Sequence, residues 1–128
     1  MSRVVDLDHI VLVCHDVEAT LAWYQRHLDL AGVRLDEWRA GAAPFPSLRV
    51  NDATIIDFIP GGTEHRGHLD HVCFVVSRED IESVRAAGEL TIEDEGPRFG
   101  ARGTAHSIYV RDPDHLLVEL RAYPGELG

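Results

Sequence analysis

The chain contains an internal repeat in which the second half restates the first. The segment LDHIVLV at residues 7–13 returns as LDHVCFV at residues 69–75, and IIDF at 55–58 aligns with LVEL at 117–120 at the same offset. A repeat of about half the chain means that each half is one structural unit. With 128 residues in all, the chain has the usual size of a single domain. We therefore expect one domain, 1–128, built from two modules at about 5–60 and 68–123.

The first repeat predicts the element order βαβββ. Residues 5–14 are apolar and rich in β-branched side chains, which indicates a buried strand. Asp16 is a typical helix N-cap, and one helical face then carries four apolar residues: Val17, Leu21, Tyr24 and Leu28. Three short strands are expected at 32–39, 45–50 and 54–59, the last two joined by a tight hairpin.

The second repeat predicts the same order. A strand at 69–76 is followed by Ser77 and Asp80, the spacing of a capping box, and by a helix that ends near Gly88. Strands are expected near 90–93, 105–111 and 115–122. The Gly-rich segment 95–103 is interpreted as a mobile loop. The Asp-Pro-Asp-His turn at 112–115 favours a left-handed or bridge conformation late in the turn.

Charge and composition exclude several classes of partner. The net charge of −10 argues against nucleic acid, because binding to phosphate backbones requires clustered basic residues. It also argues against an anionic membrane surface, and no apolar run approaches the roughly 20 residues of a membrane span. We expect a cytoplasmic protein in which Cys14 and Cys73, both within apolar strands, are reduced and buried.

Two histidines and two carboxylates occupy repeat-equivalent positions. Asp57 follows His9 at the same spacing at which Glu119 follows His71. A carboxylate within an apolar strand needs a partner, such as a metal ion, a salt bridge or hydrogen bonds. Imidazole and carboxylate together suit Zn, Ni, Mn or Fe(II). The pattern therefore predicts one divalent metal ion per site.

These features resemble the vicinal oxygen chelate superfamily, which includes glyoxalase I, extradiol dioxygenases, fosfomycin-resistance transferases and bleomycin-binding proteins. The resemblance rests on the paired βαβββ units, on Asp-His at the start of each first strand, and on Asp-Pro-Asp before an apolar strand with Glu. It implies that His9, His71 and Glu119 are metal ligands. Asp57 departs from the family pattern, where glyoxalase I has Glu, and its shorter side chain would reach the metal only through water.

The resemblance also sets the functional expectations. The fold is expected to be α+β, with two tandem βαβββ modules that form a curved sheet around a metal pocket. The expected function is a divalent-metal-dependent glyoxalase/dioxygenase-type enzyme acting on a small substrate with vicinal oxygens, with Glu119 or Asp57 as the base. The alternative is a metal-free protein that binds and sequesters a small molecule, as bleomycin-resistance proteins do. A homodimer is expected, because open sheets commonly cover their edges by pairing.

Several histidine, tyrosine and arginine residues outside these pairs are further candidates for the pocket. His106 and Tyr109 differ by an odd number of positions, so only one of them is expected to face inward on a regular strand. Arg98 and Arg102 are candidates for a clamp on a substrate carboxylate. His65 and His68 could contribute acid/base groups at a pocket rim. Other aromatic and imidazole side chains are interpreted as packing or surface residues: Trp23, Tyr24 and His115.

Overall fold

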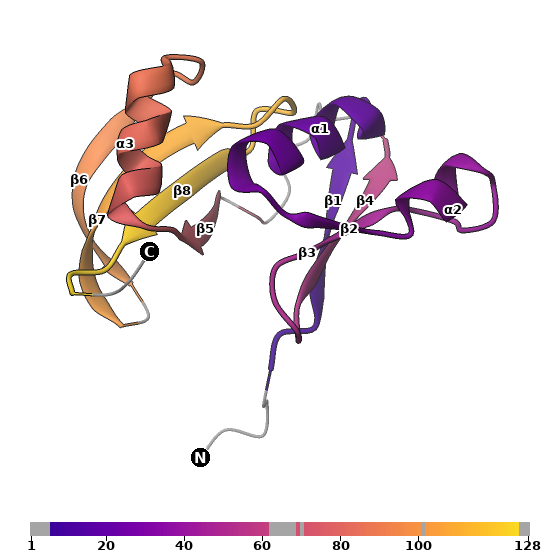
Figure 1. Cartoon of the computed structure of the whole chain (residues 1–128), viewed down its shortest axis with the longest axis horizontal. Coiled ribbons are helices and arrows are strands. Elements are labelled where there is room, and N and C mark those ends of the chain that lie inside the picture. Colours follow the sequence, from indigo (N-terminus) through magenta and orange to yellow (C-terminus); the bar gives the residue numbers. More distant parts are fainter. Residues whose placement is uncertain (1–5, 62–68, 70, 101, 126–128) are drawn as a thin grey trace. The chain divides into compact units, whose positions relative to one another are not determined.

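The computed structural model describes residues 6–61, 69, 71–100 and 102–125. The chain forms two compact units, Met1–His65 and Arg66–Gly128, which we call the N-terminal and C-terminal modules. Each contains a four-stranded mixed sheet, so the fold is α+β with two βαβββ-like modules (Figure 1). Among the described residues, no helix has the length and apolar character needed to cross a membrane.

The sheet of the N-terminal module has the strand order β1-β4-β3-β2. Its strands are β1 (His9–Cys14), β2 (Ala31–Val33), β3 (Ser47–Arg49) and β4 (Ile55–Pro60). The pair β1 and β4 is parallel, whereas β3 pairs antiparallel with both β4 and β2. The two strands with the predicted ligands His9 and Asp57 are therefore direct neighbours.

Helix α1 (Val17–Leu28) starts and packs as its sequence predicts. The Asp16 carboxylate accepts a hydrogen bond from the Ala19 amide at 3.1 Å, which caps the helix. Leu21 and Tyr24 are fully buried, and the Tyr24 ring lies 5.6 Å from the ring of Phe58 on β4. This packing covers one face of the sheet and leaves the face with His9 and Asp57 open.

The sheet of the C-terminal module has the equivalent order β5-β8-β7-β6. Its strands are β5 (His71–Val75), β6 (Asp94–Gly100), β7 (Gly103–Arg111) and β8 (Leu117–Ala122). Here β5 and β8 are parallel, and β7 pairs antiparallel with β8 and β6. The two-fold repeat of the sequence is thus a two-fold repeat of strand order.

Helix α3 (Arg78–Ala87) confirms the predicted capping box. The Asp80 amide donates to Ser77 Oγ at 2.8 Å, and the Ser77 amide donates to the Asp80 carboxylate at 3.0 Å. The helix ends at Gly88, whose φ of 66° is left-handed. Ile81 of this helix is buried. Helix α3 therefore covers one face of its own sheet, as α1 does in the N-terminal module.

The predicted strand 32–39 is wrong beyond Val33. Arg34 has a left-handed φ of 60°, and the chain then forms the short helix α2 (Leu35–Arg39). Asp36 and Glu37 lie in its first turn, where negative charge is favourable. Arg39 at its end forms a bidentate ion pair with Glu18 of α1, with both N···O distances at 2.9 Å.

The prediction of a strand near 90–93 followed by a mobile loop at 95–103 is also wrong. Strand β6 runs from Asp94 to Gly100 and forms a hairpin with β7. Proline has no backbone N–H to donate to a neighbouring strand. Pro97 is tolerated in β6 because this strand lies at the edge of its sheet. Gly96 has a φ of 153°, which glycine tolerates. Glycine and proline are unfavourable in most strands, and for this reason the sequence did not predict β6.

The two cysteines differ in burial. Cys14 is buried, as predicted, but Cys73 is exposed on the open face of its sheet, so that prediction is wrong for Cys73. Cys73 shares a face with His71, which precedes it by two positions on β5. Neither cysteine forms a disulfide within the described residues.

Replacing His115 with glycine is expected to raise the free energy of unfolding by about 0.5 to 1 kcal/mol. His115 has a left-handed φ of 68°, which confirms the conformation expected late in this turn. Its side chain is exposed, which confirms the expected surface position. Glycine removes the Cβ strain of that conformation, whereas His115→Val should destabilise the turn. Urea unfolding of the two variants measures the difference. Equal stabilities for glycine and valine would contradict this account.

Candidate functional site

His9 and Asp57 form the first histidine–carboxylate pair. Side chains alternate between the two faces of a strand, and the register of β1 with β4 puts His9 and Asp57 on the same face. This is the open face of the N-terminal sheet, opposite α1. His9 Nε2 lies 3.8 Å from Asp57 Oδ2. The Asp57 side chain is nearly buried, whereas that of His9 is 46% exposed. The imidazole of His9 is thus accessible to solvent, whereas the carboxylate of Asp57 beside it is largely shielded.

The other oxygen of Asp57 is held by neighbouring side chains. Ser47 Oγ, directly opposite on β3, donates to Asp57 Oδ1 at 2.5 Å. Arg34 Nη2 donates to Ser47 Oγ at 2.7 Å and lies 3.9 Å from Asp57 Oδ1. These contacts orient the carboxylate so that Oδ2 faces His9.

His71 and Glu119 form the second pair, on the open face of the C-terminal sheet. His71 Nε2 lies 3.3 Å from Glu119 Oε1. Ser107 Oγ donates to Glu119 Oε2 at 2.7 Å, and Arg121 Nε lies 3.8 Å from the same oxygen. As in the first module, one carboxylate oxygen faces histidine and the other faces serine and arginine.

The structure therefore adds residues that the sequence reasoning missed. A serine and an arginine accompany each carboxylate: Ser47 and Arg34 on Asp57, and Ser107 and Arg121 on Glu119. Strand alternation could have found Ser107 and Arg121, since both lie within strands that were predicted. No pattern in the sequence predicted the contact of Arg34 with Ser47. That contact depends on the left-handed turn at Arg34 after β2, which the sequence did not predict.

Each pair fits one edge of a metal-coordination polyhedron. Ligands at about 2.0 to 2.2 Å from a metal ion are roughly 3.0 to 3.5 Å apart when they occupy adjacent positions. The distance of 3.3 Å between His71 and Glu119 lies within this range, whereas the distance of 3.8 Å between His9 and Asp57 is slightly longer. Within residues 6–61, 69, 71–100 and 102–125, however, no group of three or more His, Cys, Asp or Glu is close enough to hold a metal ion. The structure brings the four predicted ligands together as two pairs.

His9 is already oriented for coordination through Nε2. Its Nδ1 lies 2.8 Å from an Asp8 carboxylate oxygen. This hydrogen bond, with a smaller contribution from Asp57, raises the pKa of His9. A histidine ligand commonly donates its second ring N–H to a carboxylate, which fixes the ring and its tautomer. Asp8 and His9 thus meet a requirement of a metal ligand.

Tyr109 and Cys73 flank Glu119. Tyr109 lies directly opposite Glu119 on β7, and Cys73 lies opposite it on β5. Desolvation, assisted by the Glu119 carboxylate, raises the pKa of Cys73 to about 12 and also raises the pKa of Tyr109. Both side chains are therefore protonated at neutral pH, so each can donate a hydrogen bond on this face.

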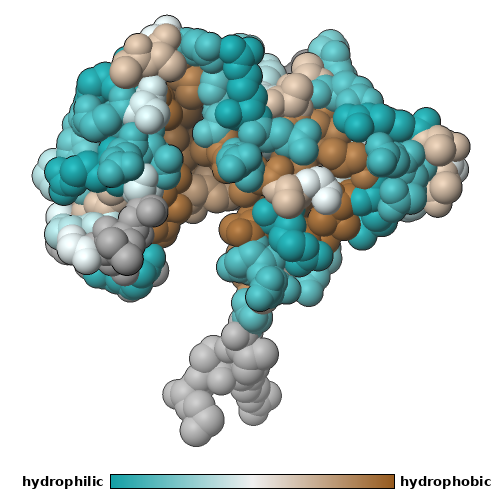
Figure 2. Space-filling model, in the orientation of Figure 1, coloured by the Kyte–Doolittle hydropathy of each residue, from teal (hydrophilic) through white to brown (hydrophobic). Residues whose placement is uncertain are grey.

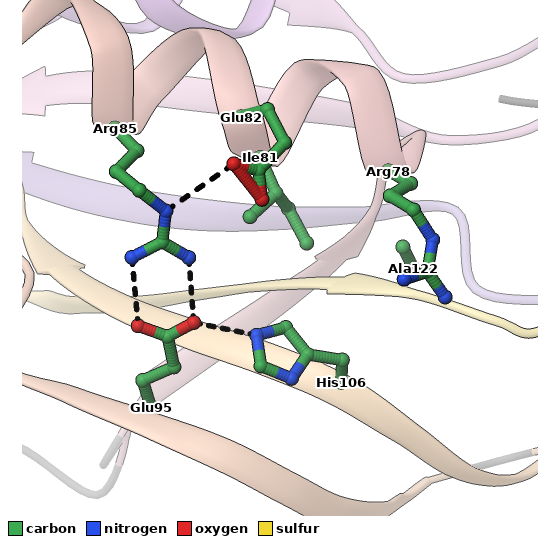
Figure 3. A pocket seen from close by; sticks show the side chains of 7 residues that line it. All are labelled: Arg78, Ile81, Glu82, Arg85, Glu95, His106 and Ala122. Carbon is green, nitrogen blue, oxygen red and sulfur yellow. Dashed lines mark hydrogen bonds and ion pairs between the residues drawn. The ribbon is translucent and has the colours of Figure 1, made fainter.

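His106 points to the other face of the sheet, which confirms that only one of His106 and Tyr109 faces the candidate site. His106 lines a cavity of about 450 Å³ beneath α3 (Figure 3). Its Nε2 lies 2.6 Å from Glu95 Oε2. The Arg85 guanidinium donates to both carboxylate oxygens of Glu95, at 3.0 and 2.6 Å. This network joins α3 to the β6–β7 hairpin and lies away from Glu119.

Glu95 is expected to titrate near pH 2. The hydrogen bonds from Arg85, and then from His106, lower the pKa of Glu95 to about 2. A lowered pKa stabilises the fold above the ordinary glutamate value and loses that contribution as the pH falls toward 2. An NMR titration of the side-chain carboxyl carbons measures it. Arg85→Gln should move the Glu95 midpoint upward, and an unchanged midpoint would contradict the assignment.

The remaining sequence candidates lie as follows. Arg98 is paired with Asp94 at 2.9 Å, and Arg102 lies over the ring of Tyr123 at 4.5 Å. Arg98 lies within β6, and Arg102 lies in the turn between β6 and β7. Tyr24 is a core residue, as interpreted. His65 and His68 lie outside the described residues.

The sequence profile of the Glyoxalase/Bleomycin resistance protein/Dioxygenase superfamily matches residues 6–120. The chain belongs to this superfamily. It is 36% identical over 121 residues to the glyoxalase domain-containing protein RDO1 of Mycosarcoma maydis, and the match covers 91% of this chain and 68% of RDO1. The resemblance inferred from the repeats and motifs is thereby confirmed.

Solved structures of the superfamily share the fold. Virulence protein STM3117 of Salmonella typhimurium is 26% identical, with a TM-score of 0.74 and coverage of 95% of this chain and 99% of that chain. A point mutant of the fosfomycin resistance protein FosX of Listeria monocytogenes, in a complex with Mn(II) and 1S,2S-dihydroxypropylphosphonic acid, has a TM-score of 0.69 at 23% identity, covering 96% of this chain and 94% of that chain. One structural relative thus binds a divalent metal ion.

Proposed function

We propose that this protein is a divalent-metal-dependent enzyme of the glyoxalase/dioxygenase type, acting on a small substrate with vicinal oxygens. The observation that carries the proposal is the repeated histidine–carboxylate pair. His9 with Asp57 and His71 with Glu119 each offer one imidazole nitrogen and one carboxylate oxygen at 3.8 and 3.3 Å. Membership of a superfamily in which a relative binds Mn(II) supports this reading.

One pair alone is too small a ligand set. Catalytic metal sites in proteins commonly use at least three protein ligands and keep a position open for water or substrate. We therefore propose that the metal ion takes its ligands from more than one pair, supplied by one chain or by two. His9, His71 and Glu119 are the expected direct ligands, and Asp57 is the expected fourth, weaker ligand.

The side chains around each carboxylate would serve the reaction in distinct ways. The bound cation would act as a Lewis acid toward the substrate oxygens. Ser47 and Ser107 hold one oxygen of Asp57 and Glu119, so that the second oxygen stays directed toward histidine. A carboxylate, Glu119 or Asp57, is the candidate base for a C–H proton. The protonated Tyr109 hydroxyl, opposite Glu119, can donate to an oxygen that gains negative charge.

The test is metal content combined with two assays. Protein purified without added metal should contain a divalent ion. Turnover of a 2-oxoaldehyde–thiol adduct without oxygen identifies an isomerase, and oxygen consumption with catechols by the Fe(II) form identifies a dioxygenase. If the protein holds no metal and binds an aromatic or cationic small molecule tightly, the alternative of a sequestering protein replaces this proposal.

The protein is also expected to form a homodimer. Within their sheets β1 and β5 are edge strands, and they carry the exposed apolar residues Val11, Val13 and Val75. Apolar surface is visible on both modules in Figure 2. Exposed edges and apolar residues favour pairing of subunits. Light scattering should give twice the chain mass of 14.2 kDa, and a monomer at all micromolar concentrations would exclude the dimer.

We place the enzyme in the cytoplasm. Within the described part of the chain neither Cys14 nor Cys73 forms a disulfide, which agrees with a reducing compartment. The net charge of −10 also supports a small-molecule substrate rather than nucleic acid or an anionic membrane.

A further inference from the structure

The cavity beneath α3 lies on the face of the C-terminal sheet opposite to Glu119. His106 and Ala122, which pair between β7 and β8, are each an odd number of positions from the residues of the Glu119 face. The volume of about 450 Å³ is within the range of about 300 to 1,000 Å³ typical of small-molecule pockets. Ile81 and Ala122, both buried, supply apolar surface to its lining (Figure 3). The cavity is thus large enough for a small molecule with an apolar part.

The two carboxylates of the cavity lining already have cationic partners. Arg85 donates to both oxygens of Glu95 at 3.0 and 2.6 Å, and its Nε donates to Glu82 at 3.4 Å. His106 Nε2 lies 2.6 Å from Glu95. The bonds from Arg85 and His106 lower the pKa of Glu95 to about 2, so Glu95 is ionised and keeps these partners at neutral pH. Arg85 therefore bridges both carboxylates and is itself fully engaged.

Arg78 is the second arginine of the lining, and its charge is not engaged in this way. In the described part of the chain, its side chain forms no ion pair or hydrogen bond. Glu82 lies four positions later on α3, a spacing at which opposite charges commonly pair, but Glu82 accepts from Arg85 instead. In Figure 3 the Arg78 side chain extends from α3 toward the sheet and ends beside Ala122. Since Arg78 is exposed, a ligand can reach its guanidinium from solvent.

We propose that this cavity is a second ligand site, which binds a monocarboxylate with a compact apolar body. The planar guanidinium of Arg78 can donate two parallel hydrogen bonds to the carboxylate. The apolar body packs on Ile81 and Ala122 and removes apolar surface from water. A ligand with several negative charges is disfavoured, because Glu82 and Glu95 line the same cavity. The site uses neither histidine–carboxylate pair, so it is independent of the proposed function.

The test uses the full-length protein as purified, with benzoate as the probe and benzamide as its uncharged control of nearly the same shape. The methyl signals of Ile81 and Ala122, followed by NMR, should shift and saturate at millimolar benzoate. Benzamide should bind at least about tenfold more weakly, because it lacks the charge that pairs with Arg78. Treatment with a chelator should leave the benzoate shifts of these two methyl groups unchanged, which separates this site from carboxylate binding at a metal ion.

Two arginine variants locate the charge that binds benzoate. Arg78→Gln should weaken benzoate binding about tenfold, as expected for the loss of a charged hydrogen bond, and it alters an exposed side chain, so the fold is kept. Arg39→Gln makes the same change in net charge at an exposed ion pair in the other module and should leave binding unchanged. Equal affinity for benzoate and benzamide, equal losses in the two variants, or shifts confined to the Glu119 face would overturn the proposal.

Discussion

Wild-type protein is expected to keep a divalent metal ion through purification, and variants with alanine at His9, His71 or Glu119 are expected to lose it. Each substitution removes one of the few ligands, so metal affinity should fall more than about 100-fold, above the effect usual for outer-shell residues. The Glu119 carboxylate and His71 ring are 3.3 Å apart, and either loss leaves its pair with a single donor. Metal analysis of the purified proteins, followed by titration calorimetry of the metal-free forms, measures the effect.

Two histidines outside the pairs serve as controls. His115→Asn removes an exposed imidazole and keeps a residue that tolerates the left-handed φ of 68°. His106→Ala removes an imidazole that faces α3, on the other side of the sheet from Glu119. Both variants should keep full metal content. Wild-type metal content in the His9, His71 and Glu119 variants would show that the pairs do not bind the cation.

Asp57→Ala is expected to weaken metal binding much less than Glu119→Ala, by about tenfold rather than more than about 100-fold. Aspartate is shorter than glutamate by one methylene, about 1.5 Å. In agreement, Asp57 Oδ2 lies 3.8 Å from His9 Nε2, whereas Glu119 Oε1 lies 3.3 Å from His71 Nε2. Competition with a metal indicator gives both dissociation constants under the same conditions.

Matched serine variants separate loss of a ligand from loss of its support. Ser47→Ala and Ser107→Ala each remove one hydrogen bond to a carboxylate and leave the carboxylate in place. Each should cost less metal affinity than loss of Glu119. If Asp57→Ala and Glu119→Ala lose metal equally, Asp57 is a full ligand and the expectation of a weaker contact is wrong.

Local patterns in the sequence predicted most of the regular structure. Asp16 and the Ser77–Asp80 capping box placed the starts of α1 and α3, since a cap is decided by residues within one turn of each other. The internal repeat made β1 equivalent to β5 and β4 equivalent to β8, and so indicated two equivalent sheets. The superfamily assignment rests on the same repeat and is confirmed.

Two local predictions failed where tertiary contacts outweighed propensity. Strand β6 contains Gly96 and Pro97, which argue against a strand, but an edge position and pairing with β7 make the conformation acceptable. After Val33, Arg34 takes a left-handed conformation and places its guanidinium on Ser47. A contact between residues on different strands cannot be found from propensities within one window.

The sequence by itself determined the two-module α+β plan, the superfamily and the two histidine–carboxylate pairs, because repeat offset and strand alternation are properties of the chain alone. The full metal-ligand set, the base and the dimer stay predictions. Only the tertiary structure decided that serine and arginine accompany each carboxylate, that Tyr109 rather than His106 faces Glu119, and that Arg121 is buried beside this carboxylate. These depend on register between strands far apart in the chain, which is set by the packing of whole sheets.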